Sequence, residues 1–267
     1  MSDDEVVAVI AARNEAAQIA DAIRSAASLA TRVIVIDDFS TDETAEYARR
    51  AGAWVVQAQP EASGNVERLF KQGFSLVRHG WILRMDADER VTDDLARSLR
   101  SFISTGEVSA VRFARLNVLF GGAVRHGGWL EARQVGLFRA DSWDRSWGNT
   151  IHQQVAVVGP VATITPRDGV MIHLDYDEVS EFVERSLMRY ARQEAQERYA
   201  MGRRFKVWRL LLRPFLRTVW KLTVRGGVLD GSRGLVVASL LGFYDGLIEM
   251  YLWEMGRSND ESSKSKT

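Results

Sequence analysis

The stretch WILRMDADER, residues 81–90, joins an apolar segment to three closely spaced acids. Its first six residues are typical of a buried strand. The acids Asp86, Asp88 and Glu89 fall where that strand should end. Carboxylates are costly to hold so close together unless a positive charge lies between them. The stretch therefore predicts a core strand and a charged site at its carboxyl end.

Three other apolar runs precede this stretch, and helical patterns separate them. The runs that predict buried strands are Val6–Ala12, Val33–Asp37 and Ala53–Gln57. Asn14 and Ser40 are expected to cap the first two helices, and Thr92 is expected to cap the helix after the acids. Alternating strands and helices over roughly the first 105 residues predict an α/β fold with a mostly parallel sheet flanked by helices.

Polar residues follow three of the predicted strands, and in such sheets ligands bind beyond the carboxyl ends of the strands. We expect Arg13–Glu15, Asp37-Asp38 and the acids from Asp86 to share one rim. In an extended Asp-x-Asp, Asp86 and Asp88 would point the same way. They would suit Mg2+ or Mn2+, which can neutralise the departing diphosphate of a nucleotide sugar. We interpret the required positive charge as this metal with its bound diphosphate.

An isolated Asp-x-Asp is more often a solvated turn whose acids cap the next helix, because the motif is short and common. Two features favour a site here. Asp86 ends a buried strand, and Asp37-Asp38 ends a second strand on the same expected rim. No glycine-rich phosphate loop follows the first strand, so no other phosphate-binding motif competes.

The composition describes an ordinary globular chain of 267 residues, with 46% hydrophobic residues, 26% charged residues and a formal net charge of zero. Zero net charge argues against a general nucleic-acid binder. The absence of cysteine excludes disulfides and thiolate metal sites. The first ten residues, MSDDEVVAVI, lack the basic residues of a signal peptide, so we expect a cytoplasmic chain.

Three segments, VVAVIAARNEAAQI, VIVIDDFSTDET and WILRMDADER, resemble inverting family 2 glycosyltransferases with the GT-A fold in their order and spacing. Three later segments are similar to the subgroup that includes lipopolysaccharide core glucosyltransferases. These are RHGGWLEARQVGLFR, IHQQVAVVGPV and IHLDYDEVSEFVERSLMRYARQEA. The likeness extends over most of the chain and implies a Rossmann-like GT-A domain.

The resemblance implies roles for the rim residues. Asp38 would contact the uracil imide of a UDP-sugar, and Asp86 would lie beside the donor sugar or its ribose. Asp88 would bind the metal on the diphosphate. His173, which ends the apolar run VMIH, is expected to complete the metal shell or to donate to phosphate. The other expected donor-binding residues are Ala11, Arg13, Asn14, Glu15 and Asp37, with Arg13 standing where many relatives have an aromatic residue.

Inverting transfer also needs a general base near the acceptor nucleophile. The subgroup usually has His-Glu where this chain has His152-Gln153, and glutamine cannot accept a proton as a base. The remaining candidates for the base are Glu131, Asp141 and Asp144, of which Glu131 and Asp141 are our predicted catalytic residues.

The acceptor side is expected to include Trp129, His152 and Gln153. A tryptophan in this half of the chain can stack on a sugar or pack into the core. The same alternatives apply to Trp143 and Trp147, and a lone histidine such as His152 is more often structural than functional.

Residues 203–225 hold eight basic residues and no acid. Arg209, Arg213, Arg217, Lys221 and Arg225 recur every four residues beside an apolar face, a pattern that predicts a basic amphipathic helix at an anionic membrane surface. The alternatives are a helix that docks on the core with a solvated basic face, and a nucleic-acid-binding helix without a reading motif. Acids in the following apolar segment favour a packed or interfacial helix over a membrane span.

These observations predict a GT-A domain (residues 1–200), a membrane-associating amphipathic appendage (201–257) and a disordered tail (258–267). The expected activity is metal-dependent, inverting transfer from a nucleotide sugar to a lipid-linked or amphipathic acceptor, without nucleic-acid partners. The enzyme would lie on the inner face of the plasma membrane and serve cell-envelope glycan or glycolipid synthesis. The alternatives are transfer to polyprenyl phosphate, which needs no strong base, and an inactive sugar-nucleotide-binding membrane scaffold.

Overall fold

The computed structural model describes residues 4–130, 133–147 and 154–264. The chain divides into two compact units. The sheet unit comprises Met1–Leu116 and Leu130–Leu174, and the helical unit comprises Asn117–Trp129 and Asp175–Thr267. These units divide the chain at other points than the boundaries at 200 and 257 predicted from the sequence.

The sheet follows the order β3-β2-β1-β4-β8-β6-β10-β5, with β7 and β9 paired to β6. The strands β3, β2, β1 and β4 are parallel, whereas β4–β8, β8–β6 and β10–β5 pair antiparallel. The strands are β1 (Val6–Ala12), β2 (Arg32–Asp37), β3 (Trp54–Gln57), β4 (Trp81–Asp86), β5 (Glu89–Val91), β6 (Ala110–Leu119), β7 (Gly122–Val124), β8 (Arg133–Arg139), β9 (Val161–Thr163) and β10 (Val170–Leu174). The α/β class is confirmed, and its parallel part is the predicted N-terminal half.

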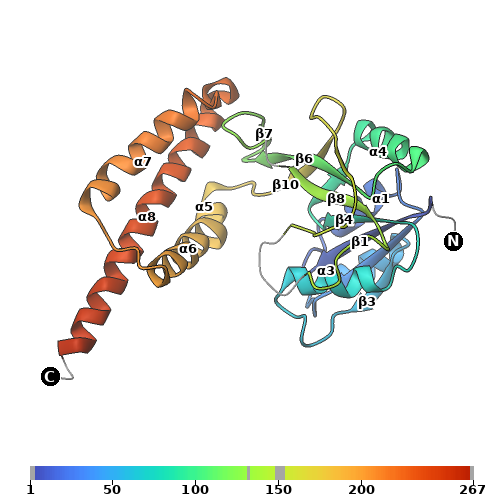
Figure 1. Ribbon diagram of the computed structural model, residues 1–267, viewed down its shortest axis with the longest axis horizontal. Coiled ribbons are helices and arrows are strands. Elements are labelled where there is room, and N and C mark those ends of the chain that lie inside the picture. The colour runs from blue at the N-terminus through green and yellow to red at the C-terminus, as the bar shows by residue number, and fades with distance from the viewer. Residues whose placement is uncertain (1–3, 131–132, 148–153, 265–267) are drawn as a thin grey trace. The chain divides into compact units, whose positions relative to one another are not determined.

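Helices cover both faces of this sheet, and the residues of β1 alternate between the two layers. Val7 and Val9 pack with Phe70 and Phe74 of α3 (Val66–Ser75). Ala8 and Ile10 pack in the other layer, with α1 (Ile19–Ala26), α2 (Thr44–Arg50) and α4 (Asp93–Thr105). Figure 1 shows α3 and α4 on opposite sides of the strands. A two-sided apolar strand is what a central parallel strand requires.

Hydrogen bonds join the loop after β1 to the loop after β2. They are made by Asn14 and Ser40, the two residues that were predicted to cap helices. Asn14 has a positive φ of 57°, and its side chain accepts the Thr41 N–H at 2.8 Å. Ser40 Oγ accepts the Asn14 N–H at 3.0 Å. The predicted caps at Asn14 and Ser40 are therefore wrong, because each bonds the neighbouring loop. The predicted cap at Thr92 is confirmed, since its side chain accepts the Leu95 N–H.

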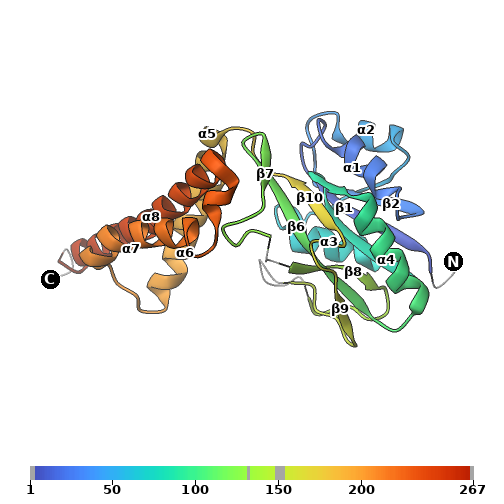
Figure 2. The same cartoon turned by 90° about the horizontal axis from the view of Figure 1, so that it is seen from above.

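The helical unit is built on two long neighbouring helices, α7 and α8, which lie side by side in Figures 1 and 2. Cβ atoms added at Gly242 and Gly246 of α8 would lie 2.2 Å from Thr218 Oγ1 and 3.5 Å from Pro214 Cγ respectively. Small residues thus let the two helices approach closely. The helices of this unit are α5 (Val179–Phe182), the π-helical turn η1 (Val183–Leu187), α6 (Met188–Ala200), α7 (Val207–Leu222), the 3-10 turn η2 (Gly227–Asp230) and α8 (Gly231–Lys264).

Buried acids of α8 pair with basic residues of and before α7. Asp245, 3% exposed, accepts from Arg217 Nη1 at 2.6 Å and lies 3.4 Å from Arg213 Nε. Glu249 is fully buried and lies 3.0 Å from Arg203 Nη2. The helices therefore meet through ion pairs as well as apolar packing, as expected for a packed helix.

One helical stretch, Gly227–Arg257, is long and apolar enough to cross a membrane by length and composition. Its most apolar window has a mean hydropathy of 1.5 and is 44% buried. A packed core helix meets the same criteria, and the buried pairs of α8 agree with packing.

Gly242→Ala should lower the stability of the helical unit. Its Cβ would fall 2.6 Å from the Pro214 carbonyl oxygen, and overpacking of this kind costs about 1–3 kcal/mol. Gly256→Ala is the matched control, because nothing lies within 4 Å of its Cβ and alanine favours a helix by about 1 kcal/mol. Thermal unfolding followed by circular dichroism should show a lower midpoint only for Gly242→Ala. Equal midpoints for the two variants would contradict the close α7–α8 packing.

Candidate functional site

A half-buried arginine lies between two of the acids of the opening stretch. Arg115 of β6 donates from Nη2 to Asp86 Oδ2 at 2.5 Å, and its Nε pairs with Glu89 Oε1. The other oxygen of Glu89 accepts the Asp86 N–H at 2.7 Å, which closes the turn between β4 and β5. The charge between these two acids is therefore Arg115, and the sequence interpretation of a metal with its diphosphate does not apply to this pair.

Burial and neighbouring cations set the ionisation of this cluster. Burial alone would raise the pKa of Asp86, but the charges of Arg84 and Arg115 outweigh it and lower that pKa. Burial raises the pKa of Glu89 against the opposing charge of Arg115. Asp86 is thus held as the anion, whereas Glu89 binds its proton more readily than an exposed glutamate.

The third acid of the stretch faces a histidine from a strand 80 residues later in the chain. Strand β10 pairs antiparallel with β5 and sets His173 opposite Glu89. His173 Nε2 lies 3.3 Å from Asp88 Oδ2. Burial alone would lower the pKa of His173, but its contact with Asp88 raises it. The structure thus brings together Asp88 and His173, as the sequence analysis expected.

Asp86 does not join these two side chains in one ligand set. Ala87 and Asp88 form a turn, so the extended Asp-x-Asp assumed from the sequence is wrong, and the Asp86 carboxylate is directed to Arg115. Within residues 4–130, 133–147 and 154–264, no group of three or more His, Asp or Glu side chains is arranged to hold a metal ion.

The Asp88 carboxylate fits a cation that takes few protein ligands. Its Oδ1 atom is buried and has no hydrogen-bond partner. Such an atom has lost water without a replacement, which costs free energy. Mg2+ commonly binds one or two carboxylates and completes its shell with water and substrate phosphates. Asp88 therefore offers one oxygen ligand to such an ion, and His173 lies beside it.

A second carboxylate, Asp38, follows strand β2, which is separated from β4 by β1. Its Oδ2 accepts the Gly64 N–H at 3.0 Å and lies 3.3 Å from Arg13 Nη1. Burial alone would raise the pKa of Asp38, but hydrogen bonds from Ser63 and Gly64 and the Arg13 charge lower it. Asp38 is therefore an anion at neutral pH and an acceptor of hydrogen bonds.

Its neighbour Asp37 has a different environment. One oxygen of the Asp37 carboxylate accepts from Gln57 Nε2 at 3.2 Å and from the Ser40 N–H at 3.4 Å. These bonds fix the turn after β2 to the end of β3. Asp37 thus supports the loop that carries Asp38.

The strand register sets these acids along one edge of the sheet unit. Ala11 of β1 lies beside Asp86 of β4, and Ala12 lies beside Asp37 of β2. Asp37, Asp38 and Asp88 each have a buried Oδ1 atom without a hydrogen-bond partner. Three unmet acceptors at the carboxyl ends of β2 and β4, the two strands that flank β1, mark a candidate site for a polar or cationic ligand.

The loop after β1 borders the same edge. Ala11 is buried at the strand end, and the Glu15 N–H donates to Thr44 Oγ1 at 2.7 Å. Arg13 and Asn14 are exposed in this loop, and 57% of the Arg13 side chain is accessible. The loop is therefore fixed by its backbone while Arg13 remains accessible beside Asp38.

The predicted catalytic residue Asp141 does not lie at this edge. Ala140 donates its N–H to the Gly80 carbonyl at 2.9 Å, so the exposed residue Asp141 follows at the amino end of β4, opposite to Asp86. Asp144 is also exposed and accepts the Ser146 N–H. Glu131 lies outside the described residues.

Of the three predicted acceptor-side residues, the structure describes Trp129. His152 and Gln153 lie outside the described residues, and Trp129 belongs to the helical unit. Trp143 and Trp147 are buried against Phe74, with ring centroids 5.7 Å apart in both cases. The two buried tryptophans are therefore core residues and do not stack on a sugar.

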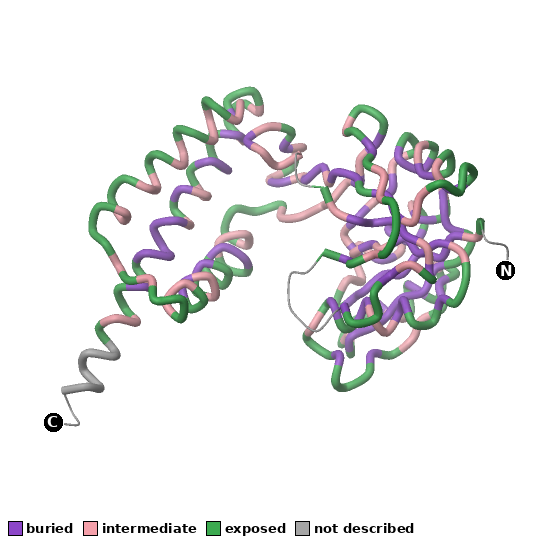
Figure 3. Tube along the Cα trace, in the orientation of Figure 1, coloured by how far each residue is buried: buried purple, intermediate pink, exposed green. Residues whose placement is uncertain are grey.

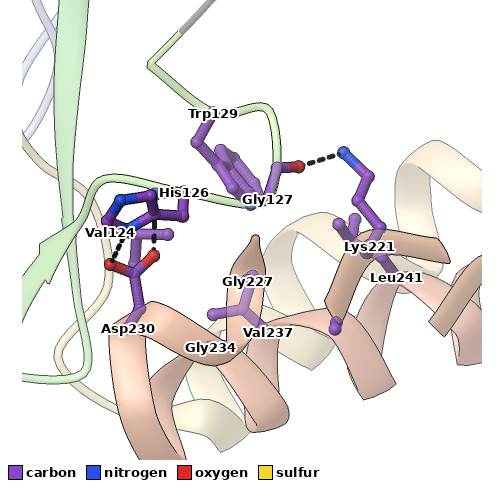
Figure 4. Close-up of a pocket in the computed structure, with 11 residues that line it drawn as sticks. Val124, His126, Gly127, Trp129, Lys221, Gly227, Asp230, Gly234, Val237 and Leu241 are labelled. Carbon is purple, nitrogen blue, oxygen red and sulfur yellow. Dashed lines mark hydrogen bonds and ion pairs between the residues drawn. The ribbon is translucent and has the colours of Figure 1, made fainter. Parts of the chain in front are cut away.

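Two polar groups were missed by the sequence analysis. Arg115 gave no signal, because its partners come from strands distant in the chain. In the helical unit, His126 Nδ1 lies 2.9 Å from Asp230 Oδ1, and Lys221 Nζ donates to the Gly127 carbonyl at 2.6 Å. Figure 4 shows these residues and Trp129 around one small pocket. They fix the loop after β7 onto η2 and α7.

The sheet with acids at its carboxyl edge defines an α/β protein with a ligand site at the strand ends. The chain belongs to glycosyl transferase family 2, whose model matches residues 7–151. This membership and the strand order agree with the GT-A fold class expected from the sequence.

Curated relatives are named as uncharacterised glycosyltransferases. The chain is 38% identical over 92 residues to an uncharacterised glycosyltransferase of Rickettsia felis. The aligned residues are 34% of this chain and 31% of that protein. A second, from Rickettsia typhi, is 24% identical over 213 residues, or 75% of this chain and 70% of its own length. The first matches thus span about a third of the length of those relatives.

Solved structures of lower similarity also match. One is glucosyl-3-phosphoglycerate synthase from Mycobacterium tuberculosis in complex with Mn2+, UDP and glucosyl-3-phosphoglycerate. It is 21% identical, covers 43% of this chain and 44% of its own, and has a TM-score of 0.34. The same synthase in complex with Mg2+ and UDP matches with the same TM-score.

Arg115→Met should destabilise the sheet unit, because it leaves Asp86 and Glu89 buried without their cation. Breaking a buried pair by removing one partner costs about 3–5 kcal/mol. Adding Glu89→Gln should recover part of that loss, since it removes one of the two stranded charges. Urea unfolding of the wild type, both single variants and the double variant would measure the coupling. If the losses in unfolding free energy of the two single variants add up to that of the double variant, the pairing of Arg115 with Glu89 is contradicted.

Proposed function

We propose that this chain transfers a sugar from a nucleotide-sugar donor bound at the carboxyl edge of the sheet unit. The observation that carries the proposal is the set of buried, unpartnered carboxylate oxygens on Asp37, Asp38 and Asp88. A nucleotide sugar supplies the groups that such acceptors need, namely base N–H groups, sugar hydroxyls and a metal-bound diphosphate. Family membership supports this assignment.

On the nucleotide side, Asp38 is proposed to accept the imide N–H of a uracil base. Its lowered pKa keeps it ionised, and charge-assisted hydrogen bonds are about twice as strong as neutral ones. Arg13 beside it can stack its guanidinium on the base. UDP-sugars are therefore the proposed donors.

On the diphosphate side, Asp88 is proposed to hold Mg2+ or Mn2+ together with His173. When bound, the ion would act as a Lewis acid toward the departing diphosphate. Asp86 cannot turn to the ion without leaving Arg115, so we propose that it contacts the donor sugar or ribose from its present position. Glu89 keeps the turn closed through the Asp86 N–H.

The acceptor is proposed to be lipid-linked or amphipathic, as in the lipopolysaccharide core glucosyltransferases that the sequence resembles, with inversion at the transferred sugar. The helical unit supports a membrane-associated enzyme. Its helix α7 buries no residue and exposes Trp208, Leu211, Leu212 and Phe215 by more than half each. Such a surface fits the interface of a bilayer, here proposed to be the cytoplasmic face of the plasma membrane.

Assays of donor hydrolysis and of transfer to acceptors distinguish this function from the two alternatives, an inactive scaffold and a polyprenyl-phosphate glycosyltransferase. Slow metal-dependent hydrolysis of a UDP-sugar by the purified chain is expected, and its complete absence with every sugar nucleotide tested would favour an inactive scaffold. Transfer to undecaprenyl phosphate alone would instead favour the polyprenyl-phosphate activity.

Asp88→Asn should abolish turnover without unfolding the chain, because it removes the charged ligand of the proposed metal. The Mn2+-dependent shift in thermal unfolding should disappear with it, which is a readout independent of activity. Asp93→Asn, an exposed acid in the first turn of α4, is the matched control. If Asp88→Asn retains more than about a tenth of the wild-type rate, a loss of only ~1.4 kcal/mol, the metal assignment is wrong.

Asp38→Ala should raise the KM for the donor more than it lowers kcat. The base lies away from the reacting carbon, so its contact contributes about equally in the ground and transition states. Steady-state kinetics with a UDP-sugar would measure both constants. A defect confined to kcat would show that Asp38 acts in the chemistry or in the fold instead.

A further inference from the structure

The helical unit has an open groove whose lining mixes cations with apolar side chains. The groove has a volume of about 750 Å³ and lies along α7, with one acid of α8 at its side. Most of its residues recur at a spacing of three and four along α7, so they share one face of that helix. Its lining includes Arg213, Leu216, Arg217, Trp220, Lys221 and Asp245.

The charges of the groove do not balance. Arg213 and Arg217 share one carboxylate, that of Asp245, and Lys221 Nζ donates to the neutral carbonyl of Gly127. Three cations therefore face one acid in the lining. Asp245 is 3% exposed, whereas about a third of each arginine side chain remains accessible, at 37% and 31%. The groove thus presents an excess of positive charge.

The residues beside these cations are apolar and exposed. Leu216, Trp220 and Val224 expose 58%, 42% and 70% of their surfaces. Figure 3 shows α7 with exposed and intermediate residues along its length. Apolar side chains next to unbalanced cations favour a ligand with an anionic head and an apolar tail over either a free ion or a neutral lipid.

We propose that this groove binds the phosphate headgroup of an anionic lipid. The two arginines would donate to the phosphate as they now donate to Asp245, since the guanidinium fork fits carboxylate and phosphate alike. Lys221 would add a point charge, and Leu216, Trp220 and Val224 would contact the acyl chains. The proposal rests on the membrane-associated function proposed above and assigns its lipid contact to particular residues.

This proposal differs from general attraction between a basic helix and an anionic surface. General attraction depends on the number of charges near the surface, about 1 kcal/mol each, and any basic residue of α7 would serve. A groove that holds a phosphate instead distinguishes Arg213, which lines it, from Arg209, which does not. Arg209 is on the same helix, near the ring of Trp208.

The test compares Arg213→Gln with Arg209→Gln, which remove the same charge from the same helix. Arg213 makes the longer of the two contacts with Asp245, so its removal leaves Asp245 paired with Arg217. Binding to phosphatidylcholine vesicles with and without phosphatidylglycerol is measured by co-sedimentation. Arg213→Gln should weaken binding to the anionic vesicles by about tenfold, and Arg209→Gln by no more than about fivefold.

Asp245→Asn should change vesicle binding in the opposite direction. It removes the acid that competes with phosphate for both arginines, so anionic vesicles should bind more tightly while the uncharged vesicles bind as before. Circular dichroism establishes that each variant is folded. Arg213→Gln leaves the shorter Arg217–Asp245 contact and the bond from Lys221 to Gly127 in place, so a folded variant that binds less tightly has lost the contribution of Arg213.

The outcomes separate this site from its alternatives. Equal weakening by Arg213→Gln and Arg209→Gln, or unchanged or weaker binding of Asp245→Asn, would each overturn the lipid headgroup site. Donor hydrolysis is measured on the same samples. It should be unchanged in all three variants, and its absence in the wild type would refute the proposed function without affecting the vesicle result.

Discussion

The pairing of Arg115 with Asp86 and Glu89 is the interaction on which the carboxyl edge of the sheet unit depends. Three ionisable groups meet there with little access to water. Two carboxylates so close would repel each other and would bind a proton if they were left alone. Arg115 allows Asp86 to stay charged, and the bond from Asp86 N–H to Glu89 turns the chain so that Asp88 faces His173.

The elements of this edge could be predicted from the sequence because their signals are local. Apolar runs that end at Ala12, Asp37 and Asp86 lead into polar residues, and parallel strands bring such ends to one edge whatever the side chains. The cap at Thr92 was predictable for the same reason, since the helix follows at once. The strand ends and this cap were therefore predicted correctly from short segments.

The partners of those residues could not be predicted, because they come from elsewhere in the chain. Asn14 has the composition of a helix cap, but its side chain accepts from Thr41, 27 residues away. Arg115 is 29 residues from Asp86 and reaches it only because β6 enters the same sheet. No periodicity in the sequence encodes that approach. The turn at Ala87 and Asp88 depends on such contacts, so the assumption of an extended Asp-x-Asp was wrong.

Helix α7 uses part of its row of basic residues for contacts within the helical unit. Its regular basic residues suggested a face directed to solvent or lipid, whereas Arg213 and Arg217 turn to the buried Asp245 and Lys221 turns to Gly127. The apolar residues Trp208 and Phe215 are exposed instead. Salt screens exposed charges within about 8 Å at physiological ionic strength, but it does not weaken apolar burial. A surface of this kind should therefore hold a bilayer mainly through its apolar side chains, with the charges selecting which lipid is bound.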